Sequence, residues 1–499
     1  METISNRLRQ MGFGLACIVL LVSPWCFGAW EVWWFWLFAA VLFASVFFFA
    51  LRLQFSAMLK RSHSVSGLRR RERSDDRLSP NAESRARRTW AKTTGVLACL
   101  PFLAYAVLRW LQPCVFADAQ RSVLLFLTPF LLAAQIVFGL GRKNVAILFG
   151  LIAVDLLLLG VYGIGNHLIT GSRLVLWAPG YPQYTVDSRA TGSYFCPNHF
   201  SGLMEIALAL GLGLLLARET SRPWRTVAAI LSLVALTGVV LSKSRGGGLV
   251  VLAILAAALV WGFDQWRPAV RWAWRGGMAL AAALALTVFL AVGKGYTERF
   301  GAEFGWSDAR HKPLGAMAGH VWDKARHSVR GVMISAALRA WREHPLLGIG
   351  PGMHQHLWPH FAASPDGDRE RGIWPSQLNN QNYSYEVHSD WVQLLEEYGL
   401  VGLVLFLGAA GSVFGVLCWG IRRERQSRVR HEWGATGRKR HGVVLGGLLA
   451  RVAMAVHSLG DFNLQIPATT WVFGALTAIA FYFATATPDR PEDAEAEDG

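Results

Sequence analysis

The sequence has few cysteines, and their spacing does not indicate a metal site. Six occur in 499 residues, without the CxxC spacing typical of structural zinc. Cys114 and Cys196 fall in segments that we expect outside the membrane, where an oxidising compartment would permit a disulfide between them. The others lie in or beside apolar runs, where cysteine usually acts as a small hydrophobic residue: Cys17, Cys26, Cys99 and Cys418.

Charged residues are also sparse, at 16% of a chain that is 53% hydrophobic and has a mean hydropathy of +0.32. Apolar runs recur along the chain, and each is long enough to cross a hydrocarbon core of ~30 Å. We therefore predict an all-α integral membrane protein with about twelve transmembrane helices. The predicted spans lie near residues 10–28, 31–50, 94–111, 122–140, 144–162, 200–217, 225–241, 246–263, 275–293, 397–420, 442–459 and 467–485.

The first apolar run lacks a good signal-peptide cleavage site. Its end reads Pro24-Trp25-Cys26-Phe27, and a second span follows at once, so we expect an uncleaved first helix. Tryptophans crowd around the turn between the two spans, as in an interfacial aromatic belt: Trp25, Trp30, Trp33, Trp34 and Trp36.

Basic residues concentrate in two loops, which argues against nucleic-acid binding as the reason for the net charge of +16. The loops at 51–93 and 421–441 are arginine-rich, as cytoplasmic loops are, and could also touch anionic lipid. Both termini are then cytoplasmic. The outer side then includes the connections at residues 163–199, 241–248, 294–396 and 460–467.

Internal repeats are absent, and Asp155 is the only clear carboxylate that we identify within a span. Transporters are often built from repeats and carry ionisable groups at mid-membrane. A transporter or flippase is therefore kept as an alternative. The polar residues gather outside the membrane, which favours an enzyme.

Two short motifs could carry chemistry. Ser244 and Arg245 stand where a span begins, so Arg245 is either an interfacial arginine or a cation beside free backbone N–H groups that suit phosphate. His388 precedes Ser389, which can cap a helix over Asp390–Tyr398. A histidine at a helix N-terminus tends to be neutral and could act as a base, although an ordinary loop histidine is the alternative.

Further candidates lie in the long loop and near the last span. A helix over Val329–Glu343 carries Arg330, and a glycine-rich turn with Gly350 follows it. The turn lacks the strand and the Gly-Lys-Ser/Thr of a phosphate loop. His457 and Asp461 form an ionisable pair, structural or functional. A competing reading takes three loop histidines as a metal cluster: His354, His356 and His360.

Over roughly residues 200–470 the order of these motifs resembles the O-antigen ligase and polymerase family of bacterial envelope glycosyltransferases. The most specific match is His388-Ser389 followed by Gly399-x-x-Gly402. Leu403 follows where the ligases typically have threonine, so the choice between ligase and polymerase stays open. The other similar segments are Ser244–Gly247, His344–Gly352 and His457–Pro467.

The resemblance implies a GT-C-like, inverting glycosyltransferase that needs no metal or other cofactor. It would move a glycan from undecaprenyl diphosphate to an acceptor hydroxyl at the periplasmic face. The acceptor is lipid A–core in a ligase and a second lipid-linked glycan in a polymerase. His388 is the expected base, and Arg245 and Arg330 are expected to bind the diphosphate. The expected supporting residues are Ser244, Gly350, Ser389, Asp390, His457 and Asp461.

This reading divides the chain into three parts. Residues 1–199 form the N-terminal helices with the basic loop 51–93. Residues 200–470 form the catalytic region, including the loop 294–396. Residues 471–499 contain the last helix and an acidic tail that we expect to be cytoplasmic.

Overall fold

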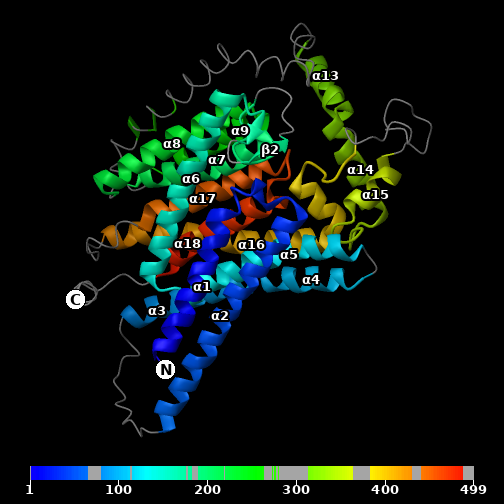
Figure 1. The fold of residues 1–499 in the computed structure, drawn as a ribbon. Helices are drawn as coiled ribbons and strands as arrows, with labels where there is room; N and C mark the ends of the chain where they lie inside the picture. Colours follow the sequence, from blue (N-terminus) through cyan, green and yellow to red (C-terminus); the bar gives the residue numbers. More distant parts are fainter. Residues whose placement is uncertain are drawn as a thin grey trace.

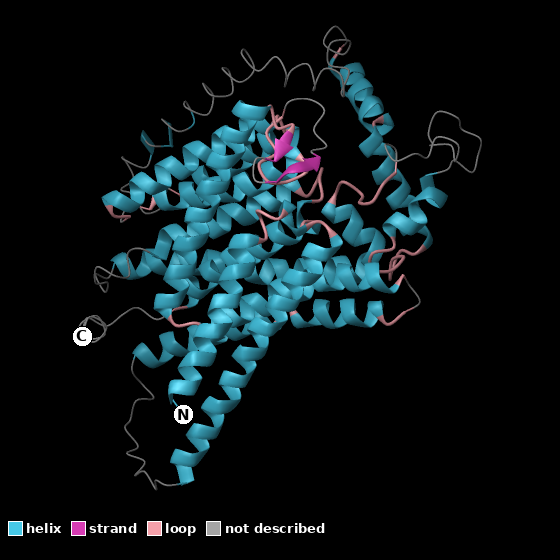
Figure 2. Cartoon of the chain, viewed as in Figure 1, coloured by secondary structure: helices cyan, strands magenta, loops and turns pink. Residues whose placement is uncertain are grey.

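The protein is a helical bundle with one short hairpin, seen here as a computed structural model (Figures 1 and 2). The structure describes residues 2–65, 80–112, 115–175, 178–182, 189–217, 220–262, 313–362, 383–429 and 440–486, together with a few residues between 272 and 279.

The first half of the chain forms six long helices and a hairpin. The helices are α1 (Glu2–Val22), α2 (Val32–Val65), α3 (Pro80–Leu97), α4 (Leu100–Trp110), α5 (Phe116–Ala134) and α6 (Arg142–Thr170). A π-helical turn, Gln135–Gly139, extends α5. Strands β1 (Leu174–Val175) and β2 (Ala178–Pro182) pair antiparallel in the connection after α6. Among the described residues, this hairpin is the departure from the predicted all-α class.

The other helices of the described residues lie in the second half of the chain. They are α7 (Pro197–Leu216), α8 (Arg222–Ser242), α9 (Arg245–Trp261), α13 (Leu314–His327), α14 (Val329–Glu343), α15 (His354–Ala362), α16 (Asp390–Val429), α17 (Arg440–His457) and α18 (Pro467–Thr485). The predicted loop helix over Val329–Glu343 is confirmed as α14 with the same bounds.

Eight helices in the described part of the chain are long and apolar enough to cross a membrane. Two shorter apolar helices, Arg245–Trp261 and His441–His457, coincide with further predicted spans. Helix α1 covers most of the first predicted span but is not among the eight. The span predicted at 275–293 lies outside the described residues. A multi-pass membrane protein is therefore confirmed, and the number twelve stays a prediction.

Helix α7 lies at the centre of the bundle and packs against α8, α9 and α17. Its small residues allow close approach, since a Cβ on Gly213 would lie 2.3 Å from the backbone nitrogen of Gly446 on α17. Small residues at such crossings are typical of membrane helix packing. The prediction that Asp155 is the only clear carboxylate in a span is wrong, because Glu205 is fully buried within α7.

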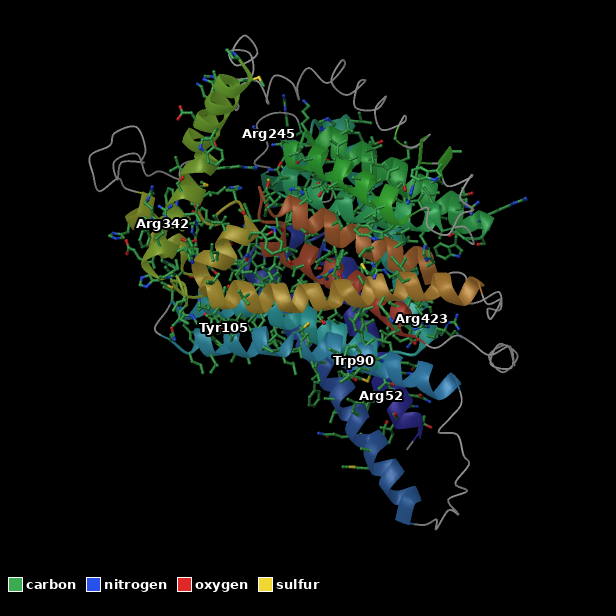
Figure 3. The ribbon with its side chains drawn as sticks, turned by 180° about the vertical axis from the view of Figure 1, so that it is seen from behind. Arg52, Trp90, Tyr105, Arg245, Arg342 and Arg423 are labelled. Carbon is green, nitrogen blue, oxygen red and sulfur yellow. The ribbon has the colours of Figure 1, made fainter. Side chains whose placement is uncertain are left out.

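Helices α13, α14 and α15 extend beyond the end of the bundle where α16 begins (Figure 1). Seen from behind, Arg342 on α14 and Arg423 near the end of α16 lie at opposite ends of the molecule (Figure 3). Within α16, Gly399 has φ 67° and ψ −172° and breaks the helix. We had expected a helix end at Gly399, and the chain there does leave the helical conformation before a second helical stretch begins.

Candidate active site

Asp461 is the centre of a polar cluster at the turn between α17 and α18. Its side chain is 2% exposed. It accepts hydrogen bonds from Asn198 Nδ2 at 2.6 Å and from the backbone N–H of Phe462 at 3.0 Å. Arg330 Nη2 donates to Oδ2 at 3.1 Å, and His388 Nδ1 lies 3.4 Å from Oδ1. The turn thus joins residues from α7, α14 and the segment before α16.

His388 is held in a strained backbone conformation that places its ring over this turn. Its φ of 59° lies in the left-handed region, which a non-glycine residue rarely adopts outside functional sites and turns. The imidazole meets the ring of Phe462 edge-on, with centroids 4.7 Å apart. The histidine side chain is 27% exposed, so a substrate group can reach it.

Ser389 and Asp390 fasten the start of α16 to the same turn. Ser389 Oγ donates to the Ser458 carbonyl at 3.0 Å and accepts weakly from the Val392 N–H. Asp390 accepts from Ser458 Oγ at 2.7 Å and from the Leu464 N–H at 3.2 Å. These bonds give both residues a structural role beside His388, because they fix the segment that carries it.

Arg330 is the second residue of α14. Ser328 caps this helix, because its side chain accepts a hydrogen bond from the Gly331 N–H at 3.1 Å. Arg330 Nη1 donates to the Gly460 carbonyl at 2.8 Å, in addition to the Asp461 pair. A guanidinium has five N–H donors, so donors are left for a further anion. Arg339, a second arginine of α14, instead donates to the Phe361 carbonyl at 2.8 Å.

The charge of Asp461 is fixed by these neighbours. Burial alone would raise the pKa of its carboxyl, but Arg330, His388 and His199 act in the opposite direction and hold the pKa well below its usual range. Asp461 is therefore ionised at neutral pH. It offers a permanent negative charge to the arginine and to the histidine.

Arg245 is the first residue of α9. Ser244 caps α9 by accepting from the Gly247 N–H at 3.1 Å. A Cβ on Gly246 would lie 3.4 Å from His457 Nε2, so the first turn of α9 lies directly against that histidine. His457 in turn contacts Glu205 Oε2 through Nδ1 at 2.7 Å. This pair joins α17 to α7 beneath the Asp461 turn.

Gly350 lies in a separate part of the same loop. Its N–H donates to the Glu397 carbonyl at 3.0 Å, and its φ of 113° is one that glycine adopts readily. The glycine-rich turn thus docks against α16. It is not among the residues that contact Asp461.

Two of the three loop histidines contact protein side chains. His354 Nδ1 contacts Glu396 at 2.7 Å and its Nε2 contacts Ser384 Oγ at 2.9 Å, while His356 contacts Asp118 at 2.8 Å. No group of three or more histidine, cysteine or acidic side chains in the described ranges could hold a metal ion. The reading of these histidines as a metal cluster is therefore not supported.

Several residues of the cluster were missed from the sequence. Arg189 donates to the Ser242 carbonyl and to Asn198 Oδ1, each at 2.7 Å. His199 Nε2 lies 3.9 Å from Asp461 Oδ1, and its ring packs on Phe462. The available signal was the polar pair Asn198-His199 at the start of an apolar span. Cys114 lies outside the described residues, so the disulfide with Cys196 stays a prediction.

Residues 228–407 match the family model described as O-antigen ligase. The chain carries an O-antigen ligase family domain. The resemblance inferred from its motifs is thereby confirmed, and the family indicates a membrane glycosyltransferase-like role in O-antigen processing. No curated protein matches the chain.

The O-antigen ligase domain includes α8, α9, α14 and the start of α16, and with them Arg245, Arg330 and His388. Asp461, which contacts two of these three, lies beyond the matched residues. The candidate site is therefore completed by the turn before α18.

Proposed function

We propose that this protein is an inverting glycosyltransferase of the ligase type. It would transfer a glycan from an undecaprenyl-diphosphate carrier to a hydroxyl of lipid A–core at the periplasmic face of the inner membrane. The observation that carries the proposal is that His388 and Arg330, from distant segments of the O-antigen ligase domain, meet on one buried carboxylate, Asp461.

His388 has the position expected of the base. Its Nδ1 lies 3.4 Å from Asp461 Oδ1, and this contact orients the ring so that Nε2 can accept a proton. The acceptor oxygen attacks the anomeric carbon, its proton passes to His388, and the bond from that carbon to the diphosphate oxygen breaks. A single displacement of this kind inverts the anomeric configuration.

The leaving diphosphate carries away the bonding electron pair, and we assign its binding to arginines. Arg330 lies beside His388 and keeps donors for phosphate oxygens, which guanidinium groups bind in bidentate fashion. We place Arg245 on the other side of the diphosphate, since it begins a helix whose first turn lies against His457. Positive charge from these side chains takes the role that a metal has in other transferases.

The helical membrane architecture is compatible with a GT-C-like fold, and the basic loops at 51–93 and 421–441 would place both termini in the cytoplasm. Helices α13–α15 would then lie in the periplasm with the site. This topology brings the polyprenyl carrier within the bilayer while its diphosphate stays at the outer surface.

The test is reconstitution of the purified protein with a lipid-linked glycan, with and without lipid A–core, followed by gel analysis. We expect the glycan to appear on lipid A–core as one block. A ladder of longer chains on the carrier without core would instead indicate the polymerase alternative. Transport of the glycan without any transfer would support the flippase alternative.

Variants connect the reaction to the site. His388→Ala and Arg330→Ala should abolish transfer while the protein still inserts. His360→Ala and Arg342→Ala are matched controls, because both residues are exposed and lie on the neighbouring helices α15 and α14. Normal product from both site variants would contradict the assignment of these residues.

A further inference from the structure

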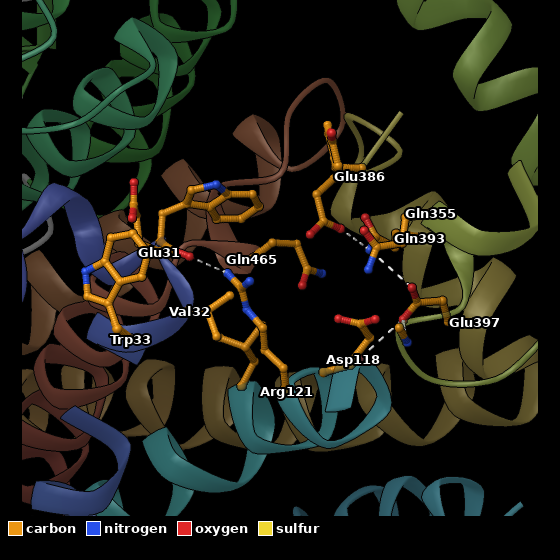
Figure 4. A pocket seen from close by; sticks show the side chains of 15 residues that line it. Glu31, Val32, Trp33, Asp118, Arg121, Gln355, Glu386, Gln393, Glu397 and Gln465 are labelled. Atoms are coloured by element: carbon orange, nitrogen blue, oxygen red, sulfur yellow. Dashed lines mark hydrogen bonds between the residues drawn. The ribbon is translucent and has the colours of Figure 1, made fainter. Parts of the chain in front are cut away.

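A second polar feature lies beside the candidate site. A cavity of about 410 Å³ opens between the turn before α2, the first half of α5 and the start of α16 (Figure 4). Its lining comes from five separate stretches of the chain. The residues are Trp30, Glu31, Val32, Trp33, Asp118, Arg121, Ser122, Leu125, Gly352, Gln355, Tyr385, Glu386, Gln393, Glu397 and Gln465.

The lining combines aromatic faces with amides and carboxylates. Trp33 and Tyr385 remain 59% and 56% exposed, so their rings are available to a ligand. Within the described part of the chain, the side-chain amides of Gln355 and Gln465 bond to no other residue, and Figure 4 shows Gln465 directed into the cavity. An amide offers both donors and an acceptor.

This combination fits a sugar ring. The C–H faces of a pyranose can pack on an aromatic ring, while its hydroxyls both donate and accept hydrogen bonds. A pocket with a few convergent polar groups on a partly apolar wall is the usual form of a small-molecule site. Here three glutamines and several carboxylates supply the polar groups.

The carboxylates of the cavity are held in place by the protein. Gln393 donates to Glu386 and, at 3.3 Å, to Glu397, and the Gly352 N–H donates to Glu397 at 2.9 Å (Figure 4). Burial raises the pKa of Glu386, although Gln393 and Arg121 partly oppose the shift. These groups are therefore preorganised acceptors, since their positions do not depend on a ligand.

The cavity offers few cationic partners to an anion. Four of its lining residues are acidic, and Arg121 is the only cation among the described residues that line it. One donor of that guanidinium is occupied, because Nη2 donates to the Trp30 carbonyl at 2.9 Å, and the group lies 4.7 Å from the Trp30 ring. Asp118 Oδ2 contacts His356 Nε2 at 2.8 Å. A phosphate or uronate would therefore find one cation among four acidic residues in the described lining.

The cavity lies close to His388 along the chain. Glu386 lies two residues before His388, and the N–H of the intervening Val387 donates to Gln393 Oε1 at 3.2 Å. Trp30 also lines a second cavity of about 230 Å³, which reaches Phe462. Trp30 thus lines both cavities, and the smaller one is lined by Phe462, whose ring contacts His388.

We propose that the larger cavity binds the acceptor sugar and that it selects an uncharged or amino-bearing pyranose. The inference rests on the proposed transferase function and assigns the two substrates by the side chains that line each site. The diphosphate of the donor binds beside Arg330, and the acceptor binds among glutamines, carboxylates and aromatic rings. Trp33, Gln355 and Gln465 are then specificity-determining residues for the acceptor.

The test measures KM separately for the two substrates in the reconstituted transfer reaction. The acceptor is lipid A–core or a second lipid-linked glycan, whichever supports transfer. Trp33→Ala and Gln465→Ala should each raise the acceptor KM by about tenfold or more and leave the donor KM within about twofold. Trp224→Ala is the matched control, because Trp224 is a partly exposed tryptophan on α8 outside the cavity.

The outcomes separate the cavity from the chemistry. An increase in the donor KM instead of the acceptor KM would overturn the assignment, and so would unchanged KM values in both cavity variants. Either of these KM results refutes the cavity inference alone if His388→Ala and Arg330→Ala abolish transfer in the same experiment. If those two variants transfer normally, it is the proposed function that fails. Circular dichroism and the melting temperature of each variant check that Trp33, which is exposed, can be truncated without unfolding.

Discussion

Replacing Asp461 by asparagine should slow transfer without unfolding the protein. The carboxylate accepts from Arg330 and Asn198 through Oδ2 and lies near His388 and the Phe462 N–H through Oδ1. An amide has one oxygen only, so either orientation of the asparagine turns its NH₂ group toward donors. The charge that both Arg330 and His388 face is lost as well.

The size of the effect follows from what Asp461 contributes in the transition state. There His388 carries the acceptor's proton while it faces Asp461, and one preorganised electrostatic contact of this kind is worth ~2.7–4 kcal/mol. His388 is 27% exposed, so water offsets part of the loss. We expect a loss of about 2 kcal/mol in transition-state stabilisation, which corresponds to roughly 30-fold in kcat.

The assay is the initial rate of transfer in proteoliposomes under saturating donor and acceptor. Asp155→Asn is the matched control, because Asp155 accepts a hydrogen bond from Trp25 Nε1 at 2.8 Å and an asparagine oxygen can accept the same bond. We expect wild-type kcat for this control. A wild-type kcat for Asp461→Asn would refute the role given to the Asp461 cluster.

Further predictions concern the fold, the pH dependence and metal. Gly399→Ala should lower the melting temperature, because a Cβ there would lie 2.2 Å from the Leu346 carbonyl oxygen at a positive φ, whereas Gly408→Ala, with open space around it, should not. Desolvation lowers the pKa of buried His354, but Glu396 opposes this and the net shift of the pKa is upward. The His354–Glu396 pair therefore stabilises the folded protein fully below about pH 6.5, and this stabilisation is lost as the pH rises through the folded-state pKa of His354. Wild-type melting temperature should thus fall more than that of His354→Gln between about pH 6 and about pH 9. Transfer should persist in EDTA; activity lost in EDTA and restored by one metal would contradict the metal-free proposal.

Much of the fold could be predicted because membrane helices are long and apolar. The predicted spans around residues 144–162 and 467–485 coincide with α6 and α18, and the caps Ser244 and Ser389 start helices as expected. Boundaries were harder, since α16 begins at Asp390 and its first turns carry buried acidic residues that hydropathy counts against a span.

The site was only partly predictable. Motif order identified His388 and Arg330, but the contact of both with Asp461 depends on how the turn after α17 folds back over α7. Glu205 was overlooked because a single carboxylate barely changes the hydropathy of an apolar run. The cavity lined by Trp33 and Gln465 could not be found from the sequence, because its five stretches are brought together only by packing.

The most direct test of the account is acceptor-dependent release of undecaprenyl diphosphate by the purified protein. The wild type should release one carrier for each glycan transferred. His388→Ala should release almost none, because the acceptor hydroxyl then lacks its base, and Arg330→Ala should bind the donor weakly. Carrier release by His388→Ala at the wild-type rate, with glycan transferred to the acceptor, would contradict the account.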